Sequence, residues 1–208
     1  MTTPREQRRQ QRLELGREHI LDAAEDVFAR KGFHDASMKE IAEGAEFSVG
    51  ALYGFFENKD DLFRHIYRRR GAQFMQGMRE VLAGRASPRR HLHDLADFQV
   101  QFFREHPQFG RLFLRTSGVN LPEPESGTDD AITENYTEAM TLQAKLFRAG
   151  QDAGELRDGD PEVLAMLFSG LVSAFQATDP VVVAEAAAGN ERMPLRELHV
   201  ILDGAFTP

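Results

Sequence analysis

The 208-residue sequence contains no cysteine, which excludes disulfide bonds, thiolate metal ligands and a cysteine nucleophile. It has no stretch near the about 20 apolar residues that a membrane span needs, and no apolar segment follows its basic N-terminus. β-branched residues run together only in PVVV at 180–183, so little of the chain suits a sheet. These absences predict a helical, cytoplasmic protein without a membrane partner.

Sequence patterns of catalysis and metal binding are also missing. The chain has no Gly-rich phosphate loop, no H-E-x-x-H, no G-x-S-x-G and no E-x-x-H pair suited to a di-iron site. His91 and His93 are two residues apart, so on a helix they point to different sides and cannot bind one metal ion together. We therefore predict no enzyme activity, no cofactor and no metal site.

The formal net charge of −8 is distributed unevenly along the chain. Residues 1–70 hold 13 of the 25 Lys and Arg and 13 of the 33 Asp and Glu, so residues 71–208 hold 12 and 20 and carry the whole −8. An acidic average argues against a nucleic-acid partner, but the first third of this chain is neutral. Net charge therefore does not exclude DNA binding.

Helical periodicity in the first third predicts three short helices that lead into a long one. Apolar residues at i, i+4, i+7 and i+8 predict an amphipathic helix over about 15–31. Ser37 begins the second helix, and Glu40 completes a capping box with it. Ser48 caps the third helix, and the fourth starts near Lys59 with carboxylates in its first turn.

The remainder of the chain predicts a larger helical bundle. Its helical segments are separated by Pro and Gly, and the clearest loop is 118–130, which has two prolines, two glycines and four acids. The predicted fold is all-α, with about nine helices in total. We place the boundaries at 1–14 for a basic N-terminal arm, 15–62 for a three-helix head and 63–208 for the helical body.

The segment SVGALYGFFENK at 48–59 indicates what kind of domain the three-helix head is. Two helices joined by a tight turn, with a second helix that presents small and polar groups, make a helix-turn-helix, whose second helix enters the major groove. Gly50 and Ala51 leave the backbone free to approach DNA, Tyr53 offers a hydroxyl, and Lys59 offers an ammonium for a phosphate. Leu52 and Phe56 are expected to face the head's own core.

Residues 20–63, ILDAAEDVFARKGFHDASMKEIAEGAEFSVGALYGFFENKDDLF, resemble the TetR family of bacterial transcriptional regulators, with Gly-x-Leu-Tyr-x-x-Phe-x-x-Lys-x-x-Leu as the main motif. The sequence departs from the family pattern at Glu46, where Gly is usual, at Ala51, where a hydroxyl is usual, and at Phe55, which cannot donate to a phosphate as His or Tyr does. The resemblance implies that the DNA contacts come from Ser37, Lys39, Ser48, Val49, Gly50, Ala51, Tyr53, Phe55 and Lys59.

The basic N-terminal segment has two interpretations. Arg5, Arg8, Arg9 and Arg12 stand against Glu6 alone. The segment is either a disordered solubilising tail or an arm that follows phosphates or enters the minor groove, and its composition favours disorder until DNA is present.

Large apolar residues of the body predict a core, and some of them a ligand pocket and a dimer interface. The candidate pocket for a small apolar or aromatic effector is lined by Phe98, Phe102, Phe113, Met140, Phe147 and Met166. Two stripes suit either intramolecular packing or the homodimer that the resemblance implies. They comprise Leu164, Leu167, Leu171 and Phe175, and Leu195, Leu198, Leu202 and Phe206.

The predicted function is a homodimeric, ligand-responsive regulator of transcription, most often a repressor in this family. Its heads would bind a palindromic double-stranded DNA operator, and a small-molecule effector in the body would release it, with the long fourth helix as the lever. The alternatives are an all-α homodimeric interaction module or an enzyme, neither of which binds DNA.

Overall fold

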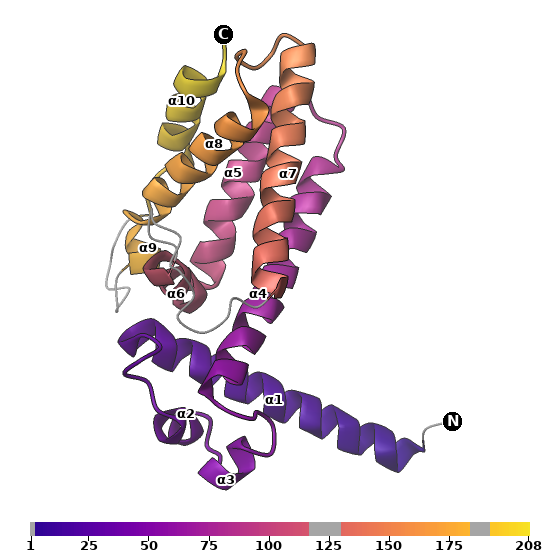
Figure 1. The fold of residues 1–208 in the computed structure, drawn as a ribbon, viewed down its shortest axis with the longest axis vertical. Helices are drawn as coiled ribbons and strands as arrows, with labels where there is room; N and C mark the ends of the chain where they lie inside the picture. Colours follow the sequence, from indigo (N-terminus) through magenta and orange to yellow (C-terminus); the bar gives the residue numbers. More distant parts are fainter. Residues whose placement is uncertain (1–2, 117–129, 184–191) are drawn as a thin grey trace. The chain divides into compact units, whose positions relative to one another are not determined.

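The computed structural model describes residues 3–116, 130–183 and 192–208, and over these residues the chain forms ten helices and no strand (Figure 1). This confirms the all-α fold class. The helix beyond the nine that the sequence predicted is α9 (Pro180–Val183). It forms one turn from the β-branched run, because Asp179 Oδ1 accepts the N–H of Val181. The predicted loop at 118–130 lies almost wholly outside the described residues. Among the helices of the described residues, each is either too short or too polar to span a bilayer.

The chain divides into two compact units, which we call the N-terminal unit (residues 1–69) and the C-terminal unit (residues 70–208). The boundary lies after residue 69 and not after residue 62, because the first turns of the fourth helix pack in the N-terminal unit. The Phe63 ring lies 5.5 Å from Phe28 and 5.1 Å from Phe33 between centroids. Arg69 pairs there with Glu18 at 2.7 Å.

The N-terminal unit contains α1 (Pro4–Lys31), α2 (Met38–Gly44), α3 (Val49–Leu52) and the start of α4 (Lys59–Leu82). The expected start of the first helix near residue 15 was wrong. Thr3 and Glu6 form a capping box, and Pro4 occupies the first turn, where its missing N–H has no intrahelical partner in any case. The basic segment, whose composition favours disorder, therefore forms the beginning of α1.

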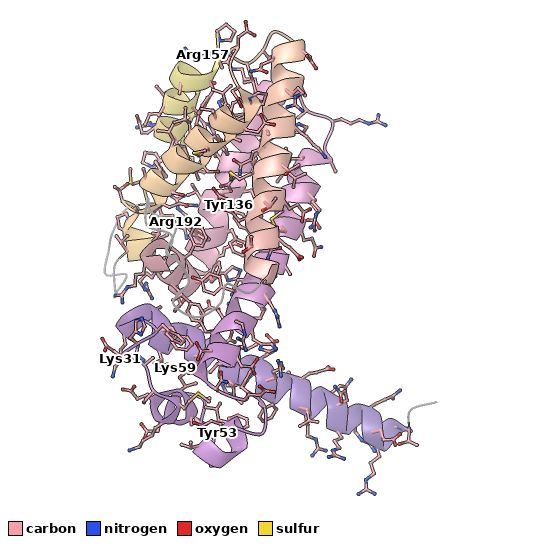
Figure 2. The ribbon with its side chains drawn as sticks, in the orientation of Figure 1. Lys31, Tyr53, Lys59, Tyr136, Arg157 and Arg192 are labelled. Atoms are coloured by element: carbon pink, nitrogen blue, oxygen red, sulfur yellow. The ribbon has the colours of Figure 1, made fainter. Side chains whose placement is uncertain are left out.

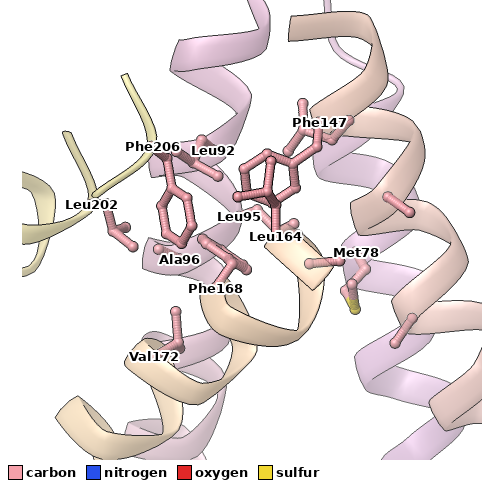
Figure 3. Packing of buried hydrophobic residues seen from close by; sticks show 14 of the residues in the cluster. Met78, Leu92, Leu95, Ala96, Phe147, Leu164, Phe168, Val172, Leu202 and Phe206 are labelled. Atoms are coloured by element: carbon pink, nitrogen blue, oxygen red, sulfur yellow. The ribbon is translucent and has the colours of Figure 1, made fainter. Parts of the chain in front are cut away.

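The C-terminal unit adds α5 (Pro88–Glu105), α6 (Pro107–Thr116), α7 (Asp130–Asp152), α8 (Pro161–Gln176), α9 and α10 (Leu195–Phe206). α5 is central and contacts each of the other five helices of this set. The last turns of α4 contribute Met75 and Met78 to the same apolar core, in which Phe147, Phe168 and Phe206 pack ring against ring (Figure 3).

A buried ion pair ties three segments of the C-terminal unit together. Arg104 on α5 binds Asp179 at 2.6 Å, and both side chains are almost fully buried. The same guanidinium donates to the carbonyl of Met193, just before α10. Because a buried charge is tolerated only when it is paired and hydrogen-bonded, this contact fixes where α9 and α10 begin on α5.

Candidate nucleic-acid interface

The turn between α2 and α3 has the geometry that the sequence predicted. The N–H of Phe47 donates to the carbonyl of Ala42 at 2.9 Å, which wraps the end of α2, and Glu46 between them has φ of 60°. α3 then begins at Ser48, whose Oγ accepts the N–H of Ala51 at 3.1 Å. α2, the turn and α3 therefore form a helix-turn-helix, and Ser48 is the predicted cap.

The outer face of α3 is open at Gly50 and Ala51, which carry little or no side chain. Leu52 and Phe56 are fully buried, as predicted, and thereby fix which side of α3 faces outward. A Cβ added at Gly50 would meet no atom within 4 Å, so the backbone is open there. The exposed residues of this surface are Ser48, Val49, Gly50, Ala51 and Tyr53, of which Tyr53 is labelled in Figure 2.

Lys59 has a structural role that the sequence did not reveal. Its ammonium donates to the carbonyls of His34 at 3.1 Å and Ala36 at 2.9 Å, and it lies 4.5 Å from the centre of the Phe33 ring. These contacts join the start of α4 to the loop that precedes α2. Side-chain patterns cannot predict backbone acceptors that are far away in the sequence. The phosphate contact of Lys59 stays a prediction.

Phe55 is half-buried and packs against α1 rather than standing free. Its ring meets Phe47 edge-on at 5.8 Å, and a Cβ at Gly16 would lie 3.3 Å from it. Arg17 donates to the Phe55 carbonyl at 3.2 Å and covers the Phe56 ring at 4.5 Å. Sequence reasoning missed Gly16 and Arg17, although a glycine inside a helical pattern is a signal of close approach.

The two candidates of α2 lie at its first turn. Ser37 caps the helix, and its Oγ accepts the N–H of Glu40 at 3.3 Å, as the predicted capping box requires. Contact with Lys31, and then the hydroxyl of Ser37, lower the pKa of the Glu40 carboxyl. Lys39 is exposed, and its ammonium lies 3.8 Å from the carboxylate of Glu43. Because an exposed ion pair of this kind is weak, the ammonium remains available to a phosphate.

The left-handed backbone at Glu46 makes a testable prediction. A side chain in this conformation costs about 1–2 kcal/mol, and glycine avoids that cost but loses about 0.5–1 kcal/mol more backbone entropy on folding. Glu46→Gly should therefore raise the free energy of unfolding by about 0.5–1 kcal/mol, measured by urea denaturation. Glu46→Gln keeps the Cβ and removes the charge, so equal gains in both variants would contradict the backbone explanation.

The candidate pocket residues do not form one site. Phe98 and Phe102 line a surface hollow of about 390 Å³ on α5, together with Asp97, Gln101, Glu105 and Leu195. Phe113 belongs to the adjoining aromatic cluster, 5.2 Å from Phe103, which also contacts Phe102. Met140 is half-buried on α7. Phe147 is fully buried in the core, whereas Met166 is 60% exposed on α8, so these two cannot share the hollow on α5.

The two predicted dimer stripes face mostly inward, and this part of the prediction needs correction. Leu164, Phe175, Leu198, Leu202 and Phe206 are buried, and Leu171 and Leu195 pack partly against the same core. These residues of both stripes belong to the C-terminal unit's own core. Leu167 is the exception, because it is exposed. The exposed apolar face of the two helices consists of Val163, Met166, Leu167, Val200 and Ile201.

Comparisons with known proteins agree with this geometry. The model of the bacterial regulatory proteins of the tetR family matches residues 20–66. The fatty acid metabolism regulator protein of Bacillus subtilis (strain 168) is 32% identical over 143 residues, which cover 67% of this chain and 70% of that protein. A TetR-like transcriptional regulator from Rhodococcus sp. RHA1 is 24% identical, with a TM-score of 0.69 over 91% of this chain and 92% of that chain. FadR from Bacillus subtilis, solved in complex with stearoyl-CoA, is 21% identical, with a TM-score of 0.68 over 89% and 94%.

A helix-turn-helix with an open second helix, followed by a separate helical bundle, defines a DNA-binding protein of the helix-turn-helix class. The matches in sequence, together with the two solved structures that share this fold, identify the family within that class. The chain belongs to the TetR family of bacterial regulatory proteins. It is a DNA-binding regulator of transcription and not an enzyme.

Proposed function

We propose that the protein is a homodimeric repressor that binds a palindromic operator through α3 and leaves it when a small apolar or aromatic effector binds the C-terminal unit. It would act in the cytoplasm, where it meets the chromosome. The observation that carries the proposal is the outer face of α3, on which Gly50 and Ala51 keep no bulk between the backbone and a DNA groove. A major groove about 12 Å wide admits such a helix.

The proposed DNA contacts divide by chemistry. Ser48, Tyr53 and Lys39 have exposed groups suited to phosphates, which position the protein without reading sequence. Val49 and Ala51 offer apolar contact to thymine methyl groups, and Gly50 allows close approach to base edges. Ser37 and Lys59 already make contacts within the unit, so each would bring only its remaining hydrogen-bonding capacity to DNA.

The exposed apolar face of α8 and α10 supports the homodimer. Val163, Met166, Leu167, Val200 and Ile201 are each about half exposed or more. A Cβ added at Gly170 or Gly204, on the same two helices, would meet nothing within 4 Å, so a partner could approach there closely. Clustered apolar exposure marks a contact surface, and a two-fold dimer of this kind brings two copies of α3 to symmetric half-sites.

The hollow on α5 supports an apolar effector. Its lining includes Phe98 and Phe102, and Phe102 contacts Phe109 of α6. The Phe98 ring also lies against α4, because a Cβ added at Gly77 would fall 2.2 Å from it. A ligand that displaces Phe98 would therefore act on α4, the helix that continues into the N-terminal unit. The names of the relatives, a fatty acid metabolism regulator and FadR with stearoyl-CoA, favour an acyl chain.

An operator-release titration tests this proposal. We expect stearoyl-CoA, a free long-chain fatty acid or an aromatic acid to lower operator affinity at least tenfold, measured by fluorescence anisotropy of labelled operator. An effector at 100 times its Kd would also stabilise the protein by about 2.7 kcal/mol. Phe98→Ala should weaken the effector response at least tenfold, and Phe98→Leu should keep most of it. A response that is the same in Phe98→Ala as in the unaltered protein would contradict the proposed site.

A further inference from the structure

The N-terminal half of α1 begins with an exposed stretch of helix, Pro4 to Leu15. From Pro4 to Leu15 every residue is exposed, and the helix is held at its start by the Thr3 and Glu6 capping box. The segment extends about 18 Å at 1.5 Å per residue. None of its residues belongs to the apolar core of the part of the chain that the structure describes.

Four arginines lie on one face of this segment. Arg5, Arg8, Arg9 and Arg12 are spaced i, i+3, i+4 and i+7, which places them together on a helix. None of the four makes a hydrogen bond or ion pair with a residue that the structure describes. The two acids nearby are otherwise engaged, since Glu6 binds Thr3 and Glu14 accepts from Gln10 at 3.2 Å. The arginine face therefore keeps its positive charge unpaired.

The arginine face points to the same side of α1 as α3. Gly16 marks this side, because a Cβ there would lie 3.3 Å from Phe55 and 3.4 Å from Phe47, in the segments that flank α3. Successive residues of a helix are rotated by about 100° about its axis. Measured about this axis from Gly16, Arg5 and Arg9 lie within about 20°, Arg12 within about 40° and Arg8 within about 80°. Several nitrogen-tipped side chains accordingly project from this part of α1 toward the side of α3 (Figure 2).

We propose that the N-terminal half of α1 is a rigid helical arm that binds the phosphate backbone of duplex DNA beside the operator half-site that α3 occupies. The inference rests on the proposed operator binding and extends its footprint outward. Arg5 and Arg12 are about 10 Å apart along the helix, the length of about three phosphates of one strand at 3.4 Å each. Because the helix already orders the arginine backbones, binding costs less entropy than it would in a disordered tail.

Two duplexes and three variants test the arm. One duplex contains only the operator, and the other adds ten base pairs of arbitrary sequence at each end. The unaltered protein should bind the longer duplex at least tenfold more tightly at low salt. Its plot of log affinity against log salt should steepen by about 2–4 per subunit, since each neutralised phosphate contributes about 0.9.

The variants distinguish the contribution of the arginine charges from that of the helical backbone. Replacement of all four arginines by glutamine should remove the gain on the longer duplex and leave affinity for the shorter one unchanged. Gln11→Pro keeps every charge but breaks the exposed helix, so it should lose most of the gain, whereas Gln11→Ala should keep it.

Three results would overturn the arm. Equal affinity of the unaltered protein for both duplexes would refute it while leaving operator binding intact. An undiminished gain in Gln11→Pro would show that the charges act from a flexible tail. Failure to bind either duplex would refute operator binding itself, and the arm with it.

Discussion

Gly50→Leu should abolish specific operator binding and leave the fold intact. The position is exposed, and a Cβ there meets no atom within 4 Å, so the new side chain disturbs nothing within the protein. Leucine is also a better helix former than glycine by close to 1 kcal/mol, which makes stability equal or slightly higher. In the complex, however, the same side chain would hold the α3 backbone away from the base edges. We expect operator affinity to fall at least 100-fold, to the level of non-specific DNA, in anisotropy titrations at fixed salt.

Two related variants provide the controls for this result. Gly50→Ala adds one methyl group and should lose a smaller part of the affinity, so the loss should grow with side-chain size. Gly54→Ala should act differently, because its Cβ would lie 3.1 Å from the carbonyl oxygen of Ala51 and strain the end of α3. We expect lower thermal stability there. Full operator affinity in Gly50→Leu would mean that α3 does not approach DNA closely at this position.

Ile201→Glu should convert the protein to a monomer. Ile201 is 50% exposed on α10 and lies on the apolar face that we assign to the dimer, where a partner would bury the new carboxylate without a counter-charge. Size-exclusion chromatography with light scattering should give one chain of 23.5 kDa instead of two. Operator affinity should fall by a factor of about 10²–10⁴, because no second subunit is then held close to the second half-site at high effective concentration.

The matched control for Ile201→Glu is Thr141→Glu. Thr141 is exposed on α7, and a glutamate there adds the same charge away from the apolar face. This variant should remain dimeric with full operator affinity. A protein that stays dimeric after Ile201→Glu would show that the exposed face of α8 and α10 is not the dimer interface.

Local signals in the sequence were sufficient to predict the helix-turn-helix. Ser37, Glu40 and Ser48 act on backbone groups three residues away, so the sequence alone specifies the starts of α2 and α3. Burial of Leu52, the last residue of α3, and of Phe56, four residues later, was predicted and defines the outer face of α3. Glu46 was identified as a departure from the family pattern, and the structure gives the reason, a positive φ that favours glycine.

Features that depend on distant partners could not be predicted in this way. The ammonium of Lys59 binds carbonyls more than twenty residues earlier in the chain, which no side-chain pattern encodes. Both faces of α8 and α10 are apolar, so periodicity could not decide that Leu198 and Leu202 fill the core while Val200 and Ile201 remain outside. The arginine-rich segment has a disordered composition, yet a capping box and continuity with a packed helix extend α1 to Pro4.

Selection of duplexes from a random pool tests most directly the claim that two copies of α3 bind DNA as a symmetric pair. The unaltered protein should enrich a palindrome whose half-sites are about one helical turn, or a multiple of it, apart, and Gly50→Leu should enrich no sequence. Enrichment of a single unpaired site, of no sequence at all, or of the same palindrome by Gly50→Leu would contradict the account.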